Sequence, residues 1–171
     1  MRNLTKFIAV VLFVGITASV SAQTPKFGHI DLQALIQVMP ERAAAETQFN
    51  KFQKELEDIF GEMQKDLQTK MASFEQLGDS ASEIKKSAKV AEIQDMQQRV
   101  QNYQQTAQQQ LQTKQTELLK PVFDKAEAAI GEVAKEKGLL YVFDIGTKVV
   151  LYKSNESMDL LPLVKTKLGI K

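Results

Sequence analysis

The residues that could support chemistry in this sequence are few. The chain has a single histidine, His29, and no cysteine. Thiol catalysis and thiolate metal sites are therefore excluded, and so is a metal site built from several histidines of one chain. His29 stands two positions before Asp31 in a segment typical of a strand, which places both side chains on one face. No nucleophile at a suitable spacing accompanies them, so a structural histidine and a capping aspartate are the better interpretation.

Phosphate chemistry has no support either, because none of the eight glycines forms a phosphate-binding loop. The charge balance is similarly uninformative about partners. The full chain carries 22 basic and 21 acidic residues. A nucleic-acid-binding protein would show a basic footprint, and the only basic cluster is Lys85, Lys86 and Lys89. We therefore predict no enzyme, no cofactor, no metal and no nucleic-acid partner.

The first 22 residues predict export. Arg2 and Lys6 give a positive start, residues 7–14 are apolar, and small residues end the segment at Ala22. This pattern is typical of a signal peptide cleaved after Ala22. An uncleaved membrane anchor is the alternative, although the apolar core is short of the roughly 20 residues that a span needs. Cleavage would remove two basic residues and leave 20 basic and 21 acidic ones, a net charge of −1.

The elements that occupy most of the mature chain are two long helices. Apolar residues recur at spacings of three and four in residues 41–77 and again in residues 82–120, as in a coiled-coil seam. Gly78 is placed to end the first helix in a left-handed conformation, and Ser80 with Glu83 has the spacing of a capping box. The two arms, each roughly 55 Å long at 1.5 Å per residue, predict an antiparallel hairpin with its tip near residues 78–82. Ten glutamines between residues 97 and 115 predict a polar, uncharged helix surface.

The two ends of the mature chain predict a small body. Residues 27–32 are typical of a strand, residues 32–38 of a helical turn, and Pro121 of a bend or a restart before a helix with a wide apolar face. Residues 139–145 and 148–152 are spaced as a β-hairpin around residues 146–147, and a short helix capped by Asp159 ends the chain. We therefore expect an α+β protein with a discontinuous body, residues 23–40 and 121–171, into which the hairpin of residues 41–120 is inserted.

So small a sheet is marginal alone, because about three strands leave exposed edges. Residues 139–145 are also apolar on both faces, which calls for cover on both sides. Self-association that completes the sheet is the simplest solution. The residues that we expect in the body core or between subunits are Phe27, Ile30, Leu140, Val142, Val149 and Leu151.

The layout as a whole resembles the Skp/OmpH family. The similarity rests on residues 27–33 before Met39-Pro40, on the long hairpin, on residues 121–138, and on the C-terminal segments at 141–144, 149–152 and 159–169. It implies a homotrimer with a small β-barrel body and three helical tentacles around a cavity. The implied activity is ATP-independent capture of unfolded outer-membrane proteins in the periplasm of a Gram-negative bacterium. Well-known members are strongly basic, whereas this mature chain is nearly neutral, which argues against contact with lipopolysaccharide or anionic lipid.

Client contacts would need soft apolar side chains, since methionine and aromatic residues adapt to varied partners. Phe60 adjoins Ile59, so one of the two must leave the seam, and we predict that Phe60 does and faces clients. Met71 and Phe74 are further candidates, and Lys85, Lys86 and Lys89 could make a basic contact near the tip. The competing interpretation is a structural or adaptor coiled coil of the cell envelope that docks one folded partner.

Overall fold

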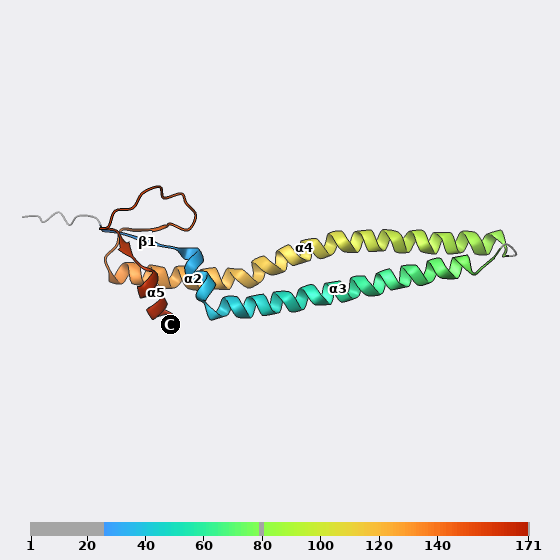
Figure 1. Cartoon of the computed structure of the whole chain (residues 1–171), viewed down its shortest axis with the longest axis horizontal. Helices are drawn as coiled ribbons and strands as arrows, with labels where there is room; N and C mark the ends of the chain where they lie inside the picture. The colour runs from blue at the N-terminus through green and yellow to red at the C-terminus, as the bar shows by residue number, and fades with distance from the viewer. Residues whose placement is uncertain (1–25, 79–80, 171) are drawn as a thin grey trace, which may run out of the picture.

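The computed structural model describes residues 26–78 and 81–170, so the predicted signal peptide lies outside the described residues. The elements, in chain order, are β1 (Phe27–Ile30), α2 (Leu32–Val38), α3 (Pro40–Glu75), α4 (Glu83–Glu136), β2 (Tyr141–Asp144), β3 (Met158–Asp159) and α5 (Leu161–Lys167). A long helical hairpin extends from a small body that both ends of this part of the chain build (Figure 1). The α+β fold with an inserted hairpin matches the prediction from sequence.

The hairpin consists of α3 and most of α4, which run antiparallel (Figure 1). Pro40 lies in the first turn of α3, where its missing amide hydrogen costs no helical bond. Gly78 adopts φ of 64°, the left-handed conformation predicted for the tip. The second arm begins near residue 82 as predicted, but not with the capping box predicted from Ser80 and Glu83. The N-cap of α4 is Ser82, whose Oγ accepts from the backbone N–H of Lys85 at 3.4 Å.

Helix α4 does not end near residue 120 but continues through Pro121 to Glu136. Of the two alternatives for Pro121, a restart is therefore wrong. Proline removes one helical hydrogen bond and crowds the preceding turn, which bends a helix that continues through it. Figure 1 shows α4 bending where it passes from the hairpin to the body. One helix thus serves as the second arm of the hairpin and as the main helix of the body.

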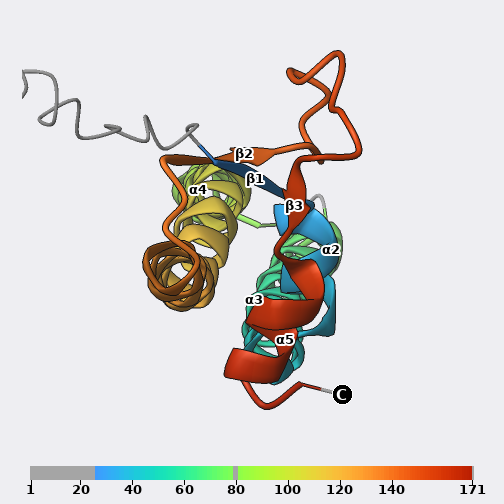
Figure 2. The ribbon, with the colours of Figure 1, turned by 90° about the vertical axis from the view of Figure 1, so that its left-hand side faces the viewer.

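The sheet has the order β2-β1-β3, with β1 parallel to both neighbours (Figure 2). The predicted β-hairpin between residues 139–145 and 148–152 is wrong. Strand β2 pairs with β1 and not with the residues that follow it, and residues 148–152 form no strand. The predicted strand at residues 139–145 also lies at an edge of the sheet rather than at its centre, which β1 occupies.

The turn after β2 explains this difference. Asp144 Oδ1 accepts from the backbone N–H of Gly146 at 2.8 Å and from that of Leu32 at 3.2 Å. The carboxylate therefore closes the turn on itself and ties it to the start of α2. Lys148 then takes a positive φ of 58°, a conformation that breaks an extended strand. Residues 148–157 leave the sheet as a loop, and the chain returns to it at β3 (Figure 2).

The core of the body lies between the sheet, α2, α4 and α5. The predicted wide apolar face of α4 is confirmed, since Val122, Ala126, Ala129 and Val133 are all buried. The largest fully buried side chains are Leu35, Met39, Leu160, Val122 and Val164. Together with the buried Ile30 and the partly buried Val142 and Met158, these residues show that the core reaches every element of the body.

Polar contacts fix the ends of the body helices. Asp31 caps α2 as predicted, accepting from the N–H of Ala34 at 2.8 Å. Asp159 Oδ1 accepts from the N–H of Leu161 at 2.9 Å, at the start of α5. Lys167 at the end of α5 pairs with Glu132 and Glu136 of α4 at 2.8 Å each. The hydrogen bonds to these carboxylates, that to Glu132 first, raise the pKa of Lys167.

Candidate functional site

The middle of the hairpin seam is organised around two aromatic rings. Phe60 of α3 stacks on Tyr103 of α4, with ring centroids 6.5 Å apart and planes 10° apart. The Tyr103 hydroxyl donates to the backbone carbonyl of Leu56 at 3.1 Å. Ile59 is the residue that turns outward, with 45% of its surface exposed. The expectation that Phe60 leaves the seam is therefore wrong, because its ring pairs across the hairpin, and its contact with clients stays a prediction.

The three candidate client-binding residues are not brought together. Met71 is 44% exposed and Phe74 is half-buried near the tip end of α3. Phe60 lies eleven positions before Met71, about 16 Å along the helix at 1.5 Å per residue. Phe60 borders an apolar hollow of about 320 Å³ between the two helices. The hairpin thus presents separate contacts along its length and no single pocket formed by these three side chains.

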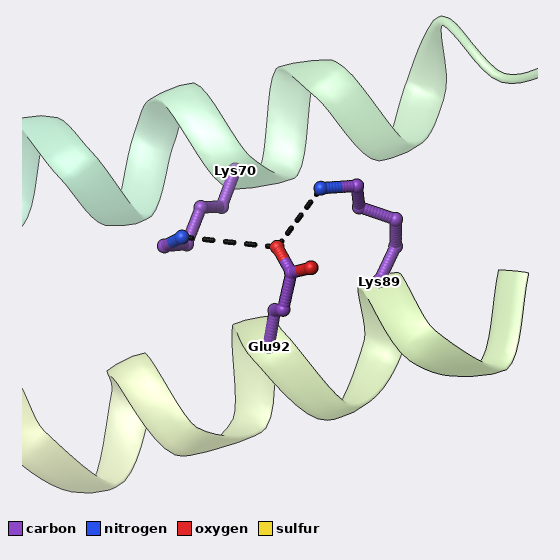
Figure 3. A network of polar contacts seen from close by, with 3 residues as sticks. All are labelled: Lys70, Lys89 and Glu92. Atoms are coloured by element: carbon purple, nitrogen blue, oxygen red, sulfur yellow. Dashed lines mark hydrogen bonds and ion pairs between the residues drawn. The ribbon is translucent and has the colours of Figure 1, made fainter. Parts of the chain in front are cut away.

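Near the tip, two of the three predicted basic residues, Lys86 and Lys89, pair with carboxylates, and Lys85 is exposed. Glu92 of α4 accepts from Lys89 at 2.9 Å and pairs with Lys70 of α3 at 3.8 Å, which links the two helices (Figure 3). The hydrogen bond from Lys89 holds the pKa of Glu92 below its usual value, and the charge of Lys70 acts in the same direction. Lys86 lies 3.6 Å from Glu83. This pairing weakens the case for a basic contact site at the tip.

The outer face of the sheet carries an exposed aromatic cluster. Phe27 of β1 stacks on Tyr141 of β2, with centroids 6.3 Å apart and planes 9° apart. Phe143 lies 6.2 Å from Phe27 and 6.1 Å from Tyr141. Each of the three side chains is at least 41% exposed. Large contiguous apolar patches on a protein surface mark interaction sites, so this face is a candidate interface.

The predicted body-core residues divide into two groups in one chain. Ile30 is buried, and Val142 is half-buried against the core. The others are exposed within the chain, by 41% at Phe27, 61% at Leu140, 79% at Val149 and 96% at Leu151. These four do not belong to the core of a single chain, and their burial between subunits stays a prediction.

His29 is 4% exposed on β1 and holds the loop that precedes β3. Its Nδ1 lies 2.9 Å from Ser157 Oγ, and its Nε2 lies 3.0 Å from Lys153 Nζ. An ammonium group can only donate, so Nε2 accepts and the neutral ring carries its hydrogen on Nδ1, which donates to Ser157. A ring in this tautomer cannot take a proton from the Ser157 hydroxyl. The contact therefore holds the loop against β1 and is not a nucleophile–base pair.

Sequence reasoning missed the partners of His29 and those of Glu92. Ser157 and Lys153 are more than 120 positions from His29, and nothing in their local pattern points to a histidine on a distant strand. The three-residue spacing between Lys89 and Glu92 could have predicted their ion pair, since residues at i and i+3 are neighbours on a helix.

Among the described residues, no group of three or more histidine, cysteine or acidic side chains could hold a metal ion. No described helix combines the length and the apolar composition that crossing a membrane would require.

The comparisons with known proteins agree with this architecture. A sequence model of the OmpH-like outer membrane proteins matches residues 26–168. The chain belongs to the OmpH-like family. A crystal structure of an OmpH-like protein from Caulobacter crescentus superposes with a TM-score of 0.72 at 12% identity, covering 90% of this chain and 89% of that one. A comparison with curated protein sequences gives no significant match. The OmpH-like fold therefore accounts for the body and the hairpin alike.

Proposed function

We propose that this OmpH-like protein is an ATP-independent holding chaperone of the Gram-negative periplasm, which binds unfolded outer-membrane proteins and prevents their aggregation. Family membership supports this function, as does the fold shared with the Caulobacter crescentus protein, which is described as a candidate outer membrane chaperone. The predicted signal peptide supports the compartment. N-terminal sequencing of the exported protein should begin at Gln23, whereas an intact N-terminus would indicate a membrane anchor.

The observation that carries the proposal is the free surface of the hairpin. Helices α3 and α4 pack on each other over the whole projection, which extends well beyond the body (Figure 1). Apolar side chains such as Ile59 and Met71 remain exposed along it. Contacts of this kind are weak singly, but several arms that act on one client gain avidity. A holding chaperone needs this combination of loose contacts and easy release.

We also propose that three chains assemble through their bodies into a β-barrel, with the three hairpins around a central cavity. The aromatic cluster on the outer face of the sheet supports this assembly, and so do the exposed Val149 and Leu151 of the neighbouring loop. An open sheet edge also favours pairing with a further strand. Residues 149–152, which are apolar and belong to no strand within the chain, are candidates to supply that strand.

Light scattering on the mature protein tests the assembly. We expect a trimer at micromolar concentration, and Phe143→Asp should dissociate it, since the change places a charge in the proposed interface. Ile84→Asp is the matched control, because Ile84 is 82% exposed at the far end of the hairpin. A monomeric wild-type protein, or a Phe143→Asp variant that remains trimeric, would contradict the assembly.

A turbidity assay tests the function. An outer-membrane barrel protein is diluted from urea with and without the mature protein, in the absence of nucleotide. We expect suppressed aggregation at a stoichiometric ratio of trimer to client. Equal aggregation in both samples would refute the proposed chaperone function. Tight binding of one folded partner, with no effect on unfolded proteins, would favour the adaptor coiled coil instead.

A further inference from the structure

The half of the hairpin nearest the body contains two hollows between α3 and α4. The first, of about 320 Å³, lies beside Leu56, Phe60 and Tyr103. The second, of about 280 Å³, lies closer to the body beside Phe49 and Leu118. These volumes lie on either side of the lower limit of ligand pockets, which span about 300–1,000 Å³. Each hollow is therefore large enough to receive an apolar side chain of a bound polypeptide.

Both hollows open on the same flank of the hairpin. Residues three and four positions apart lie on one stripe of a helix. The lining residues follow this spacing on α3 at Glu46, Asn50, Gln53 and Glu57, and on α4 at Gln104, Gln108, Leu111 and Gln115. We call this continuous feature the proximal groove. A third hollow, lined by Phe52, Gln110 and Thr113 among others, uses a different stripe of α4 and faces the other flank.

The first hollow exists because the seam is underfilled at Ala107. This small side chain stands between the larger Tyr103 and Leu111 and lines the hollow with them. The ring of Tyr103 is held by its stack on Phe60 and by its hydrogen bond to the Leu56 carbonyl, so it does not lie across the space beside Ala107. The floor of the hollow is therefore apolar and open to the flank.

The rim of the proximal groove is mostly uncharged amide. Glutamine and asparagine side chains both donate and accept hydrogen bonds, as does a peptide backbone. Such side chains line the groove at five positions: Asn50, Gln53, Gln104, Gln108 and Gln115. The charged lining residues are Arg42, Glu46 and Glu57, and Glu57 accepts from Gln53 at 2.8 Å. This rim matches an uncharged polypeptide and offers little attraction to a strongly charged one.

The spacing of the hollows matches an extended chain. Glu46 lines one hollow and Leu56 the other, ten positions apart on α3, which is about 15 Å at 1.5 Å per residue. Four residues of an extended chain span about 13 Å at 3.3 Å per residue. Side chains at i and i+4 of such a chain point to the same face. Membrane-spanning β-strands alternate apolar and polar residues, so they present apolar side chains at this interval.

We propose that the proximal groove binds an extended, uncharged segment of an unfolded barrel protein, with apolar side chains i and i+4 in the two hollows and its backbone against the amide rim. This inference rests on the proposed chaperone function and adds the site and the client pattern. It places the main grip between the body and the middle of the hairpin rather than at the tip.

Ala107→Leu is the test variant, because the larger side chain fills the first hollow and leaves the helix sequence favourable. Ala91→Leu, at an exposed position of α4, is the matched control. The ligand is a labelled, uncharged peptide with two leucines four positions apart, followed by fluorescence anisotropy. We expect Ala107→Leu to weaken binding about tenfold or more, since the burial of one apolar side chain is lost. Ala91→Leu should bind as the wild type does, and circular dichroism should show both variants fully helical.

A second peptide of the same composition with adjacent leucines tests the spacing, and we expect it to bind several-fold more weakly. A photo-crosslinker at Gln108 should label the client, whereas one at Gln110, on the other flank, should label it much less. Equal binding of the two peptides, or unchanged binding by Ala107→Leu, would overturn the groove. If the wild type suppresses aggregation and Ala107→Leu does so equally well, the proposed binding groove is refuted, while the proposed chaperone function stands. If the wild type holds no client, the proposed function fails.

Discussion

Gly28→Ala is expected to destabilise the body, although it removes a flexible residue from a strand. A Cβ at this position would lie 2.5 Å from Leu160 Cδ1 and 2.7 Å from Leu139 Cδ1. Leu160 is fully buried, so its side chain has little room to move in a close-packed core. Overpacking of this kind costs about 1–3 kcal/mol, whereas replacing glycine in a strand gains only about 0.5–1 kcal/mol. We therefore expect a net loss of about 1 kcal/mol in the free energy of unfolding.

Gly61→Ala is the matched control with the opposite sign. Gly61 is exposed within α3, and no atom lies within 4 Å of an added Cβ, so the helix should gain about 1 kcal/mol. Urea unfolding followed by circular dichroism measures both variants, at several protein concentrations because assembly makes the midpoint concentration-dependent. A Gly28→Ala protein as stable as the wild type would show that the two leucines move aside at no cost and that the packing argument is wrong.

Three further substitutions test single contacts. Tyr103→Phe keeps the aromatic stack but loses the hydrogen bond to the Leu56 carbonyl, which should lower the free energy of unfolding by about 0.5–1 kcal/mol in urea. Asp144→Ala leaves the partly buried N–H of Leu32 without its acceptor and should cost about 1–3 kcal/mol, with faster amide exchange at the start of α2, whereas the exposed N–H of Gly146 can bond to water. The pKa of Glu92 is lowered by Lys89, so its stabilising contribution is complete above its usual pKa of 4.5 and is lost as the pH falls below that value. Glu92→Gln should therefore show a shallower loss of stability on acidification, measured as the urea midpoint against pH.

The hairpin was predictable because its determinants are local. The spacing of apolar residues defines the seam, and Gly78, two residues beyond the C-cap of α3, takes the expected left-handed conformation. The choice between Ile59 and Phe60 was not local, since both lie next to each other on one helix and spacing alone does not rank them. It depends on Tyr103, 43 positions after Phe60, whose ring stacks on Phe60 across the hairpin.

The body was less predictable because its sheet is built from segments far apart in the chain. A turn between two apolar runs normally indicates a β-hairpin, and this signal was misleading at residues 146–147. The carboxylate of Asp144 binds the N–H of Leu32, 112 positions away, and so fastens the turn to α2. The central strand β1 then pairs with β2 and β3 in parallel. Parallel pairing depends on long crossover connections, which no short sequence pattern records.

The charges of the hairpin largely neutralise one another, and this bears on how clients are captured. Lys54 pairs with Asp58, Lys89 with Glu92, and Lys114 with Glu117. Exposed pairs add little stability, but each cancels a charge that would otherwise attract distant acidic clients. Capture should therefore depend on short-range apolar contacts. Added salt screens attraction between exposed charges, with a Debye length of about 10 Å at 0.1 M, but it does not screen apolar contacts. We expect suppression of aggregation to change little when the salt concentration is raised severalfold, and a steep loss with salt would show that charge attracts the clients after all.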